Sequence, residues 1–327
     1  MSKVIEAIKT FVEPANKLID AVSSAIGKVY EPTHVKRMAN AHAHEINVIG
    51  KALSENADIP IVYDKGGISA DIKDYDDFVK RTQGRMAYQE LRKQQNIESV
   101  TEQAYQLLEN ETQCSNEPVS QDWMIRFFNS VEDISEIQMQ SIWAKILAGE
   151  VKRPKSFSLR TLETLHNLSQ EEAQLFQQVA SFAIKVKDNP DKVFFSSNMD
   201  LLKKHGISYE DMRLLEECGL VSMKTFLQIT GNISDETDWF YNNKHVILLK
   251  NKLNEEVEYS MGVIILTSAG VELFSILSFQ CNEAYIIDVA ENFFNENDGN
   301  ILVKVKEISS IEGNEIQWQD ENIIEFK

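Results

Sequence analysis

The sequence has few of the features on which disulfide-rich or membrane-spanning proteins depend. Its 327 residues include only three cysteines, Cys114, Cys218 and Cys281, which stand far apart and favour a reducing compartment over a disulfide framework or a zinc site. No stretch approaches the roughly 20 consecutive apolar residues that a membrane-spanning helix needs. No signal peptide is visible at the N-terminus. These absences predict a cytoplasmic protein, with peripheral contact to the inner membrane as an alternative.

Patterns of catalytic chemistry are also lacking. No Ser-His-Asp, Cys-His or paired-carboxylate pattern stands out, and the pair Gly66-Gly67 lacks the spacing of a phosphate-binding loop. His42 and His44 are two residues apart, so they point to different faces of a helix and have no partner at metal-ligand spacing. We expect no cofactor, no metal and no catalytic residues, and a non-enzymatic protein is favoured over an enzyme assembled from distant residues.

The charge balance limits the choice of partners. The formal net charge of −18 opposes broad attraction to nucleic acid, because phosphate binding requires a clustered basic surface. DNA is therefore not an expected partner. A protein partner or a second copy of the chain is expected instead.

The segment from Val119 to Phe176 contains several helix start and stop signals in close succession. The candidate N-caps are Ser120, Ser135 (in a capping box with Gln138), Ser158 and Ser169 (in a capping box with Glu172). Gly149 stands where a left-handed residue would end one of these helices, and Pro154 cannot continue it. The signals predict an array of helical hairpins with short connectors.

A basic cluster surrounds the connector after this helix. Its members are Lys152, Arg153, Lys155 and Arg160. Such a cluster can bind a phosphate, an acidic peptide or a lipid headgroup. Alternatively, its side chains cap helix C-termini and pair with Glu150 and Glu163. The cluster is the candidate partner-binding or anion-binding patch.

The first thirty residues have the apolar spacing of an amphipathic helix, which Pro14 should kink or split. The candidate membrane or oligomer face consists of Ile5, Ile8, Phe11, Val12, Leu18, Ile19, Val22 and Ile26. One interpretation is a helix that lies on an anionic membrane surface. The alternatives are a helix that packs on its own domain and a homo-oligomer interface.

Helical and β patterns divide the remaining sequence. They predict a hairpin around Asp64–Gly67, a long helix over Tyr75–Leu108, and a tail that forms a helix and then a β-hairpin. Strands are predicted at 193–195, 223–229, 245–250 and 262–267. The fold class is mainly α, and α+β overall. The predicted domains are an amphipathic N-terminus (1–53), a hairpin-like insertion (54–74), a helical core (75–187), a winged-helix-like domain (188–281) and a tail (282–327).

Several strings resemble a known family. DWMIRFFNSVEDIS, WAKILAGEVKRPKSFSLRTLETLHNLS, YEP and YQELRKQQNIE are similar to a bacterial family described only as a domain of unknown function (number 2806). That family has no established activity to carry over. The layout, an amphipathic N-terminus before a helical core, is similar to that of abortive infection alpha proteins of antiphage systems.

The C-terminal part has a second resemblance. LLEECGLV followed by strands and LTSAGVELF resembles the winged-helix fold, but the expected recognition helix has four acids against Arg213 alone. An acidic helix repels phosphate, so a protein-interaction role is expected for this domain.

Three functions remain as hypotheses. The first is a non-enzymatic bacterial defence or stress protein, with conditional membrane contact through its N-terminal helices and a C-terminal domain that senses a signal or binds a partner. The second is a soluble oligomeric scaffold or sensor. The third is a transcription regulator with a winged helix.

Overall fold

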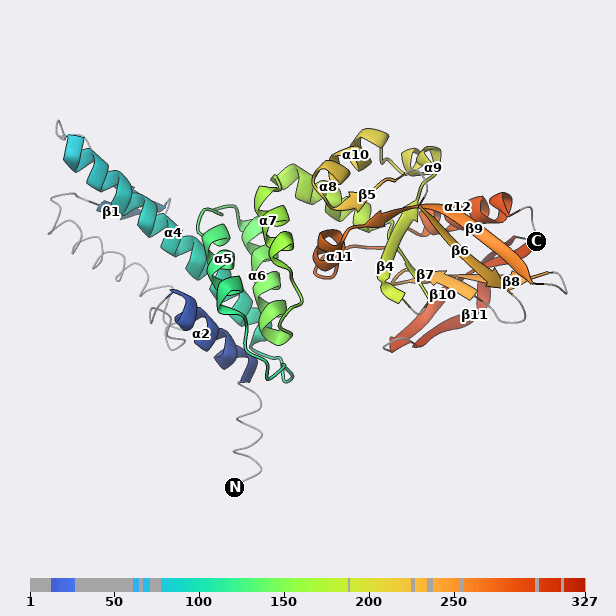
Figure 1. Cartoon of the computed structure of the whole chain (residues 1–327), viewed down its shortest axis with the longest axis horizontal. Coiled ribbons are helices and arrows are strands. Elements are labelled where there is room, and N and C mark those ends of the chain that lie inside the picture. Colours follow the sequence, from blue (N-terminus) through green and yellow to red (C-terminus); the bar gives the residue numbers. More distant parts are fainter. Residues whose placement is uncertain are drawn as a thin grey trace, which may run out of the picture. The chain divides into compact units, whose positions relative to one another are not determined.

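The computed structural model describes residues 13–26, 61–64, 67–70, 78–187, 189–224, 227–233, 238–252, 256–297, 300–312 and 315–326. Within them the fold is α+β, with helices in the N-terminal half and an antiparallel sheet in the C-terminal half (Figure 1). The chain divides into two compact units, Met1–Leu162 (unit 1) and Glu163–Lys327 (unit 2). Helix α7 (Leu159–Asn167) contains the division. The predicted five-part division of the chain stays a prediction.

Unit 1 consists of packed helices and one small hairpin. Its other described helices are α2 (Glu13–Ile26), α4 (Phe78–Leu108), α5 (Gln121–Val131) and α6 (Ile137–Lys152). Strand β1 (Ile61–Asp64) pairs with β2 (Gly67–Ala70), so the hairpin is confirmed. The long helix is confirmed from Phe78 onward, and residues 71–77 lie outside the described residues. Helix α6 packs on α4, and α2 contacts α4, α5 and α6 (Figure 1).

Aromatic side chains form the centre of the unit 1 core. Trp143 on α6 and Phe127 on α5 are both 0% exposed, and their rings meet edge to face with 5.5 Å between centroids. Trp123 stacks on Phe127 at 5.1 Å. Such ring pairs contribute beyond the area that they bury. They fix α5 against α6.

The N-caps explain where most helices of the central block begin. Ser120 accepts a hydrogen bond from the Trp123 amide at the start of α5, as predicted. Ser158 accepts one from Thr161 at the start of α7. Ser169 and Glu172 form the predicted capping box of α8 (Gln170–Ala180).

Two local predictions in this block are wrong. Glu136, not Ser135, caps α6 through a 2.7 Å bond from the Met139 amide, and Ser135 accepts a bond from Asn96 instead. Gly149 does not end α6, which continues to Lys152. The close approach of the Phe157 ring requires a glycine here, because a Cβ atom at position 149 would stand 2.8 Å from that ring.

Unit 2 is built around one antiparallel sheet. Its described strands are β3 (Ile184–Val186), β4 (Asn189–Ser196), β5 (Val221–Ser222), β6 (Gln228–Ile233), β7 (Asp238–Tyr241), β8 (His245–Asn251), β9 (Val257–Leu266), β10 (Ile301–Glu312) and β11 (Glu315–Phe326). The strand order is β11-β10-β8-β7-β3-β4-β9-β5, and β6 also pairs with β9. The predicted tail hairpin is confirmed as β10–β11, and it joins the sheet through β8.

Short helices accompany the sheet. They are α8, α9 (Met199–Lys204), α10 (Tyr209–Glu217), α11 (Ser268–Phe274) and α12 (Glu283–Glu296). Helix α12 contacts β8, β9, β10 and β11. Its Phe293 ring packs on Phe240 of β7 and Tyr259 of β9, so α12 covers one face of the sheet. Strands β3 and β7 have no counterpart among the predicted strands.

Candidate functional site

The connector between α6 and α7, residues 153–158, is held rigidly by a buried carboxylate. Glu150 is 2% exposed, and its two carboxylate oxygens accept the backbone N–H groups of Lys155 at 2.6 Å and Phe157 at 3.0 Å. The Trp123 indole donates to the Phe157 carbonyl at 2.8 Å. Lys155 adopts a φ of 70°, which a non-glycine residue rarely does. These contacts position the basic side chains around the connector.

The four predicted cations are exposed but do not act as one cluster. Lys152 forms an ion pair with Glu111 at 2.8 Å, and Lys155 pairs with Glu117. The hydrogen bond with Glu117 raises the pKa of Lys155. Arg153 donates to Ser156 at 3.0 Å, and Arg160 is exposed on the first turn of α7.

The acids that pair with this patch come from the segment between α4 and α5. That segment is also bonded through its backbone to the C-terminal end of α6, because the Ser115 amide donates to the Lys152 carbonyl at 2.9 Å. On its other side, the Ser115 carbonyl accepts a 2.8 Å hydrogen bond from the Lys17 ammonium of α2. Ser115 therefore links the C-terminal end of α6 to α2.

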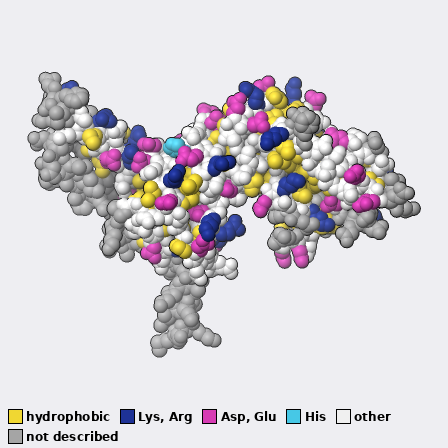
Figure 2. Space-filling model, viewed as in Figure 1, with side chains coloured by type: hydrophobic (Ala, Val, Ile, Leu, Met, Phe, Trp, Pro, Cys, Tyr) yellow, Lys and Arg dark blue, Asp and Glu magenta, His cyan; other side chains and the backbone are white. Residues whose placement is uncertain are grey.

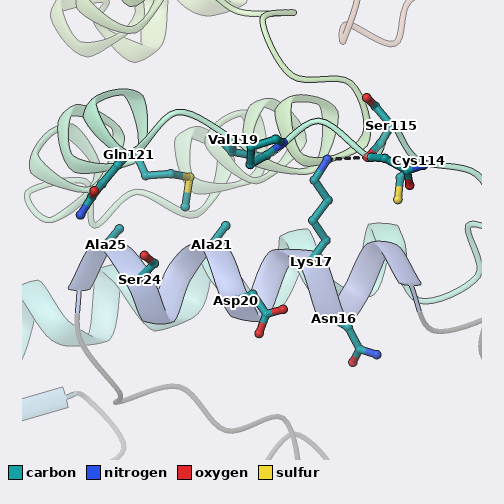
Figure 3. Close-up of a pocket in the computed structure, with 13 residues that line it drawn as sticks. Asn16, Lys17, Asp20, Ala21, Ser24, Ala25, Cys114, Ser115, Val119 and Gln121 are labelled. Carbon is teal, nitrogen blue, oxygen red and sulfur yellow. Dashed lines mark hydrogen bonds between the residues drawn. The ribbon is translucent and has the colours of Figure 1, made fainter.

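A pocket of about 480 Å³ lies between α2 and this segment (Figure 3). Its lining is formed by α2 on one side and by the segment and the start of α5 on the other: Asn16, Lys17, Asp20, Ala21, Ser24, Ala25, Cys114, Ser115, Asn116, Pro118, Val119, Gln121 and Met124. The volume is in the range of small-molecule sites, and the mixture of small apolar and polar side chains is typical of them. The pocket leaves one flank of α2 incompletely packed.

The predicted apolar face of the N-terminus is partly core in this structure. Leu18 and Val22 are 0% exposed, and Ile19 and Ile26 are half-buried. Ile5, Ile8, Phe11 and Val12 lie outside the described residues. The part of this candidate membrane or oligomer face that lies on α2 is therefore largely buried in unit 1, where α2 contacts α4, α5 and α6.

Unit 2 contains two histidine–carboxylate contacts. His245 is fully buried, and its Nε2 atom lies 3.2 Å from Glu283. Burial lowers the pKa of His245, although Glu283 opposes this effect. Asp288 contacts His205 at 2.7 Å and Lys204 at 2.8 Å. Desolvation acts to raise the pKa of Asp288, but the hydrogen bonds from Lys204 and His205 outweigh it and lower the pKa.

Neither contact belongs to a larger group of metal-ligating side chains in the described part of the chain. No group of three or more metal-ligating side chains occurs among the residues that the structure describes. Within the same residues, no helix is long and apolar enough to cross a membrane.

Sequence reasoning missed the residues that organise the candidate site. Glu150 was considered only as a partner for the basic side chains, whereas it binds backbone amides of the connector. No sequence pattern singled out Ser115. A signal for Glu150 was present, because it stands four residues after Ile146 and three after Leu147 on the apolar face of the predicted helix, where an acid requires a partner.

Comparisons with known proteins identify a family for this chain but no individual relative. No curated protein and no solved structure matches the chain. The family described as "Protein of unknown function (DUF2806)" matches residues 80–290, which include the connector, the segment that lines the pocket and most of unit 2, but not α2. Because this match covers more than half of the sequence, the chain belongs to the DUF2806 family.

Proposed function

We propose that this protein is a non-enzymatic sensor or effector of bacterial defence or stress, in which α2 docks reversibly on unit 1 and contacts an anionic membrane when it is released. The observation that carries the proposal is the position of Leu18 and Val22. They belong to the amphipathic face that suits a membrane surface, yet they are fully buried in the docked helix. Docking and membrane contact therefore compete for the same side chains.

The energetics support a conditional contact. Burial of a Leu or Val side chain is worth about 1.5–3 kcal/mol, so Leu18 and Val22 together hold α2 with roughly 3–6 kcal/mol. That free energy corresponds to a released fraction of about 10⁻² to 10⁻⁴. A membrane surface can bury the same two side chains. Each lysine near anionic lipid contributes about 1 kcal/mol more to the free energy of membrane binding. A modest additional signal is then sufficient for release.

The pocket supplies a place for such a signal. It borders α2 along Asn16–Ala25, and the Lys17 bond to Ser115 closes one part of it (Figure 3). A ligand that binds both walls would favour the docked state, whereas one that displaces Lys17 from Ser115 would favour release. The assignment to defence or stress rests on the layout similarity to abortive infection proteins.

Flotation with vesicles tests the proposal. Deletion of residues 1–32 would expose the core beneath Leu18 and Val22, so a locked helix is a cleaner variant. Asn16→Cys on α2 and native Cys114 line the same pocket and can be joined by a short bis-maleimide in a Cys218→Ser, Cys281→Ser background. The matched control is the same protein treated with a monofunctional maleimide.

We expect the control to float with phosphatidylglycerol-containing vesicles and the locked protein to remain in the bottom fraction. Vesicles of phosphatidylcholine alone should recover less of either protein. Equal flotation of locked and control proteins, or no flotation of the control, would contradict the proposal.

A winged helix in unit 2 remains a second proposal. The succession α9-α10-β5 and the neighbouring strands β4-β9-β5 support it, with β6 paired to β9 in the position of a wing, but β3, β7 and β8 extend the same sheet beyond a winged helix. Helix α10 would be the recognition helix. Its exposed Glu210, Glu216 and Glu217 outnumber Arg213, which pairs with Glu217 at 2.7 Å.

This charge favours a protein partner over duplex DNA for that helix. A gel shift with duplex DNA at low salt tests the regulator alternative, and absence of retardation removes it. The alternative of an oligomeric scaffold predicts a dimer or larger species at micromolar concentration by light scattering.

A further inference from the structure

One face of the unit 2 sheet combines lysines with aromatic side chains, although the chain as a whole carries a formal charge of −18. Directly opposed residues in an antiparallel sheet share a face. Lys185 of β3 opposes Tyr241 of β7, which opposes Val246 of β8, which in turn opposes Lys306 of β10. This row spans three strand spacings of about 4.8 Å, or roughly 14 Å. It has a half-buried lysine at each end, and its centre is buried: Tyr241 and Val246 are 8% and 0% exposed, and Trp239 and Trp318 pack against them.

A second row runs beside the first. Trp239 of β7 opposes Leu248 of β8, which opposes Lys304 of β10. The Lys187 ammonium lies 3.9 Å from the centre of the Trp239 ring, and the Trp318 ring of β11 meets Trp239 edge to face at 5.7 Å. We call the surface formed by Lys185, Lys187, Trp239, Lys304, Lys306 and Trp318 the lysine–tryptophan face.

This face lies on the side of the sheet opposite α12. Phe240, which carries the α12 contact, is the strand neighbour of Trp239 and so points to the other side. Trp239 and Trp318 are half-buried. Figure 2 shows Lys and Arg side chains beside hydrophobic ones over the region of β4, β7 and β10.

Much of the positive charge on this face is not neutralised by carboxylates of the described residues. Lys304 pairs with Glu325 at 3.6 Å, and burial lowers the pKa of Lys185, an effect that Cys281 and Asp191 oppose. Lys306 donates to the Asp320 backbone carbonyl at 2.7 Å, and Lys187 contacts an aromatic ring. A carbonyl or a ring leaves the net charge of the ammonium available to an anion.

We propose that the lysine–tryptophan face binds single-stranded nucleic acid, with phosphates on the lysines and an unpaired base stacked on Trp318. Aromatic rings between cationic side chains match the alternation of base and phosphate in a single strand. Lys187 already occupies one face of the Trp239 ring, so Trp318 is the stacking ring. The proposal concerns a different unit from the proposed membrane contact, and neither depends on the other.

Fluorescence anisotropy with labelled single-stranded RNA and DNA oligonucleotides of mixed sequence tests the proposal on the full chain. We expect Trp318→Ala to weaken binding about tenfold or more, and Trp318→Phe to restore most of it, because stacking needs only an aromatic ring. Binding should also quench tryptophan emission. Since Trp123 and Trp143 are 5% and 0% exposed, that quenching reports on Trp239 and Trp318.

Two double-lysine variants separate the effect of lost phosphate contacts from the effect of a changed net charge. Lys187→Gln with Lys306→Gln should weaken binding and lower the slope of log K against log salt by about 1.4, or about 0.7 for each lost phosphate contact. Lys203→Gln with Lys224→Gln, which changes the net charge equally elsewhere on unit 2, should leave the slope unchanged. Circular dichroism of each variant confirms that the fold is intact.

Three outcomes would overturn the proposal. The first is absence of single-strand binding at low salt by the wild-type protein. The second is equal loss of binding in the two double-lysine variants. The third is binding of duplex DNA or polyglutamate as tight as that of single strands, because each would identify the face as a site for another partner.

Discussion

At the scale of single residues, Glu150 explains more of unit 1 than any of the basic side chains near it. A buried carboxylate is costly unless its oxygens are hydrogen-bonded, and both oxygens of Glu150 accept backbone amides of the connector. Gly149 admits the Phe157 ring that the same connector inserts into the core. The string LAGEVKRPKSF is therefore a folding motif. It contains the end of α6, the connector, and the two α6 residues that hold the connector in place, Gly149 and Glu150.

Replacement of Glu150 tests this role. We expect Glu150→Ala to lower the free energy of unfolding by about 2–4 kcal/mol, because two backbone N–H groups lose their acceptor in a buried loop. Urea unfolding followed by tryptophan emission measures the change, in a Trp239→Phe, Trp318→Phe background that leaves Trp123 and Trp143 of unit 1 as the reporters. Exposed Glu109→Ala is the matched control and should stay within about 0.5 kcal/mol of the wild type. A loss of similar size in both variants would contradict the assigned role.

At the scale of elements, α9 and α12 are joined by one charged contact. Asp288 of α12 bonds to Lys204 at the end of α9 and to the adjacent His205. Because these bonds lower the pKa of Asp288, the ionised carboxylate stabilises the folded state above its ordinary pKa of 3.8, and this stabilisation is lost as the pH falls below that value.

The pH dependence of a variant tests this contact. We expect Asp288→Asn to destabilise the protein by about 1–3 kcal/mol at pH 7, with a difference from wild type that shrinks as the pH falls through 3.8. Thermal unfolding across this pH range measures it. Glu291→Gln, on the same helix, is the control. A difference that stays constant with pH would mean that Asp288 acts through packing and not through its charge.

The elements that sequence reasoning located are those with local signals. Ser120, Ser158 and Ser169 each cap a helix through a bond within three residues, so their sequence spacing is sufficient to predict them. Strand β7 was missed because Asp238–Tyr241 is short and its pairing with β3 depends on residues far away in the sequence, although β8 follows it closely. The pocket was missed for the same reason, since Lys17 and Ser115 are 98 residues apart.

At the scale of the whole molecule, the net charge of −18 hides an uneven distribution. Lysines gather on one face of the unit 2 sheet, while acids such as Glu210 and Glu216 occupy α10. Composition alone could therefore oppose broad attraction to nucleic acid, but it could not show that strand register would bring lysines from β3 and β10 onto one surface. The two proposals assign different partners to the two units.

The central proposal is the release of α2, and the reactivity of native Cys114 tests it most directly. Cys114 is half-buried in the pocket wall that faces α2 (Figure 3). We predict that phosphatidylglycerol-containing vesicles increase its rate of modification by a thiol reagent several-fold, as resolved by peptide mass spectrometry, and that phosphatidylcholine vesicles do not. A Cys114 rate that is unchanged by anionic vesicles to which the protein binds would mean that α2 stays docked, and would contradict the proposal.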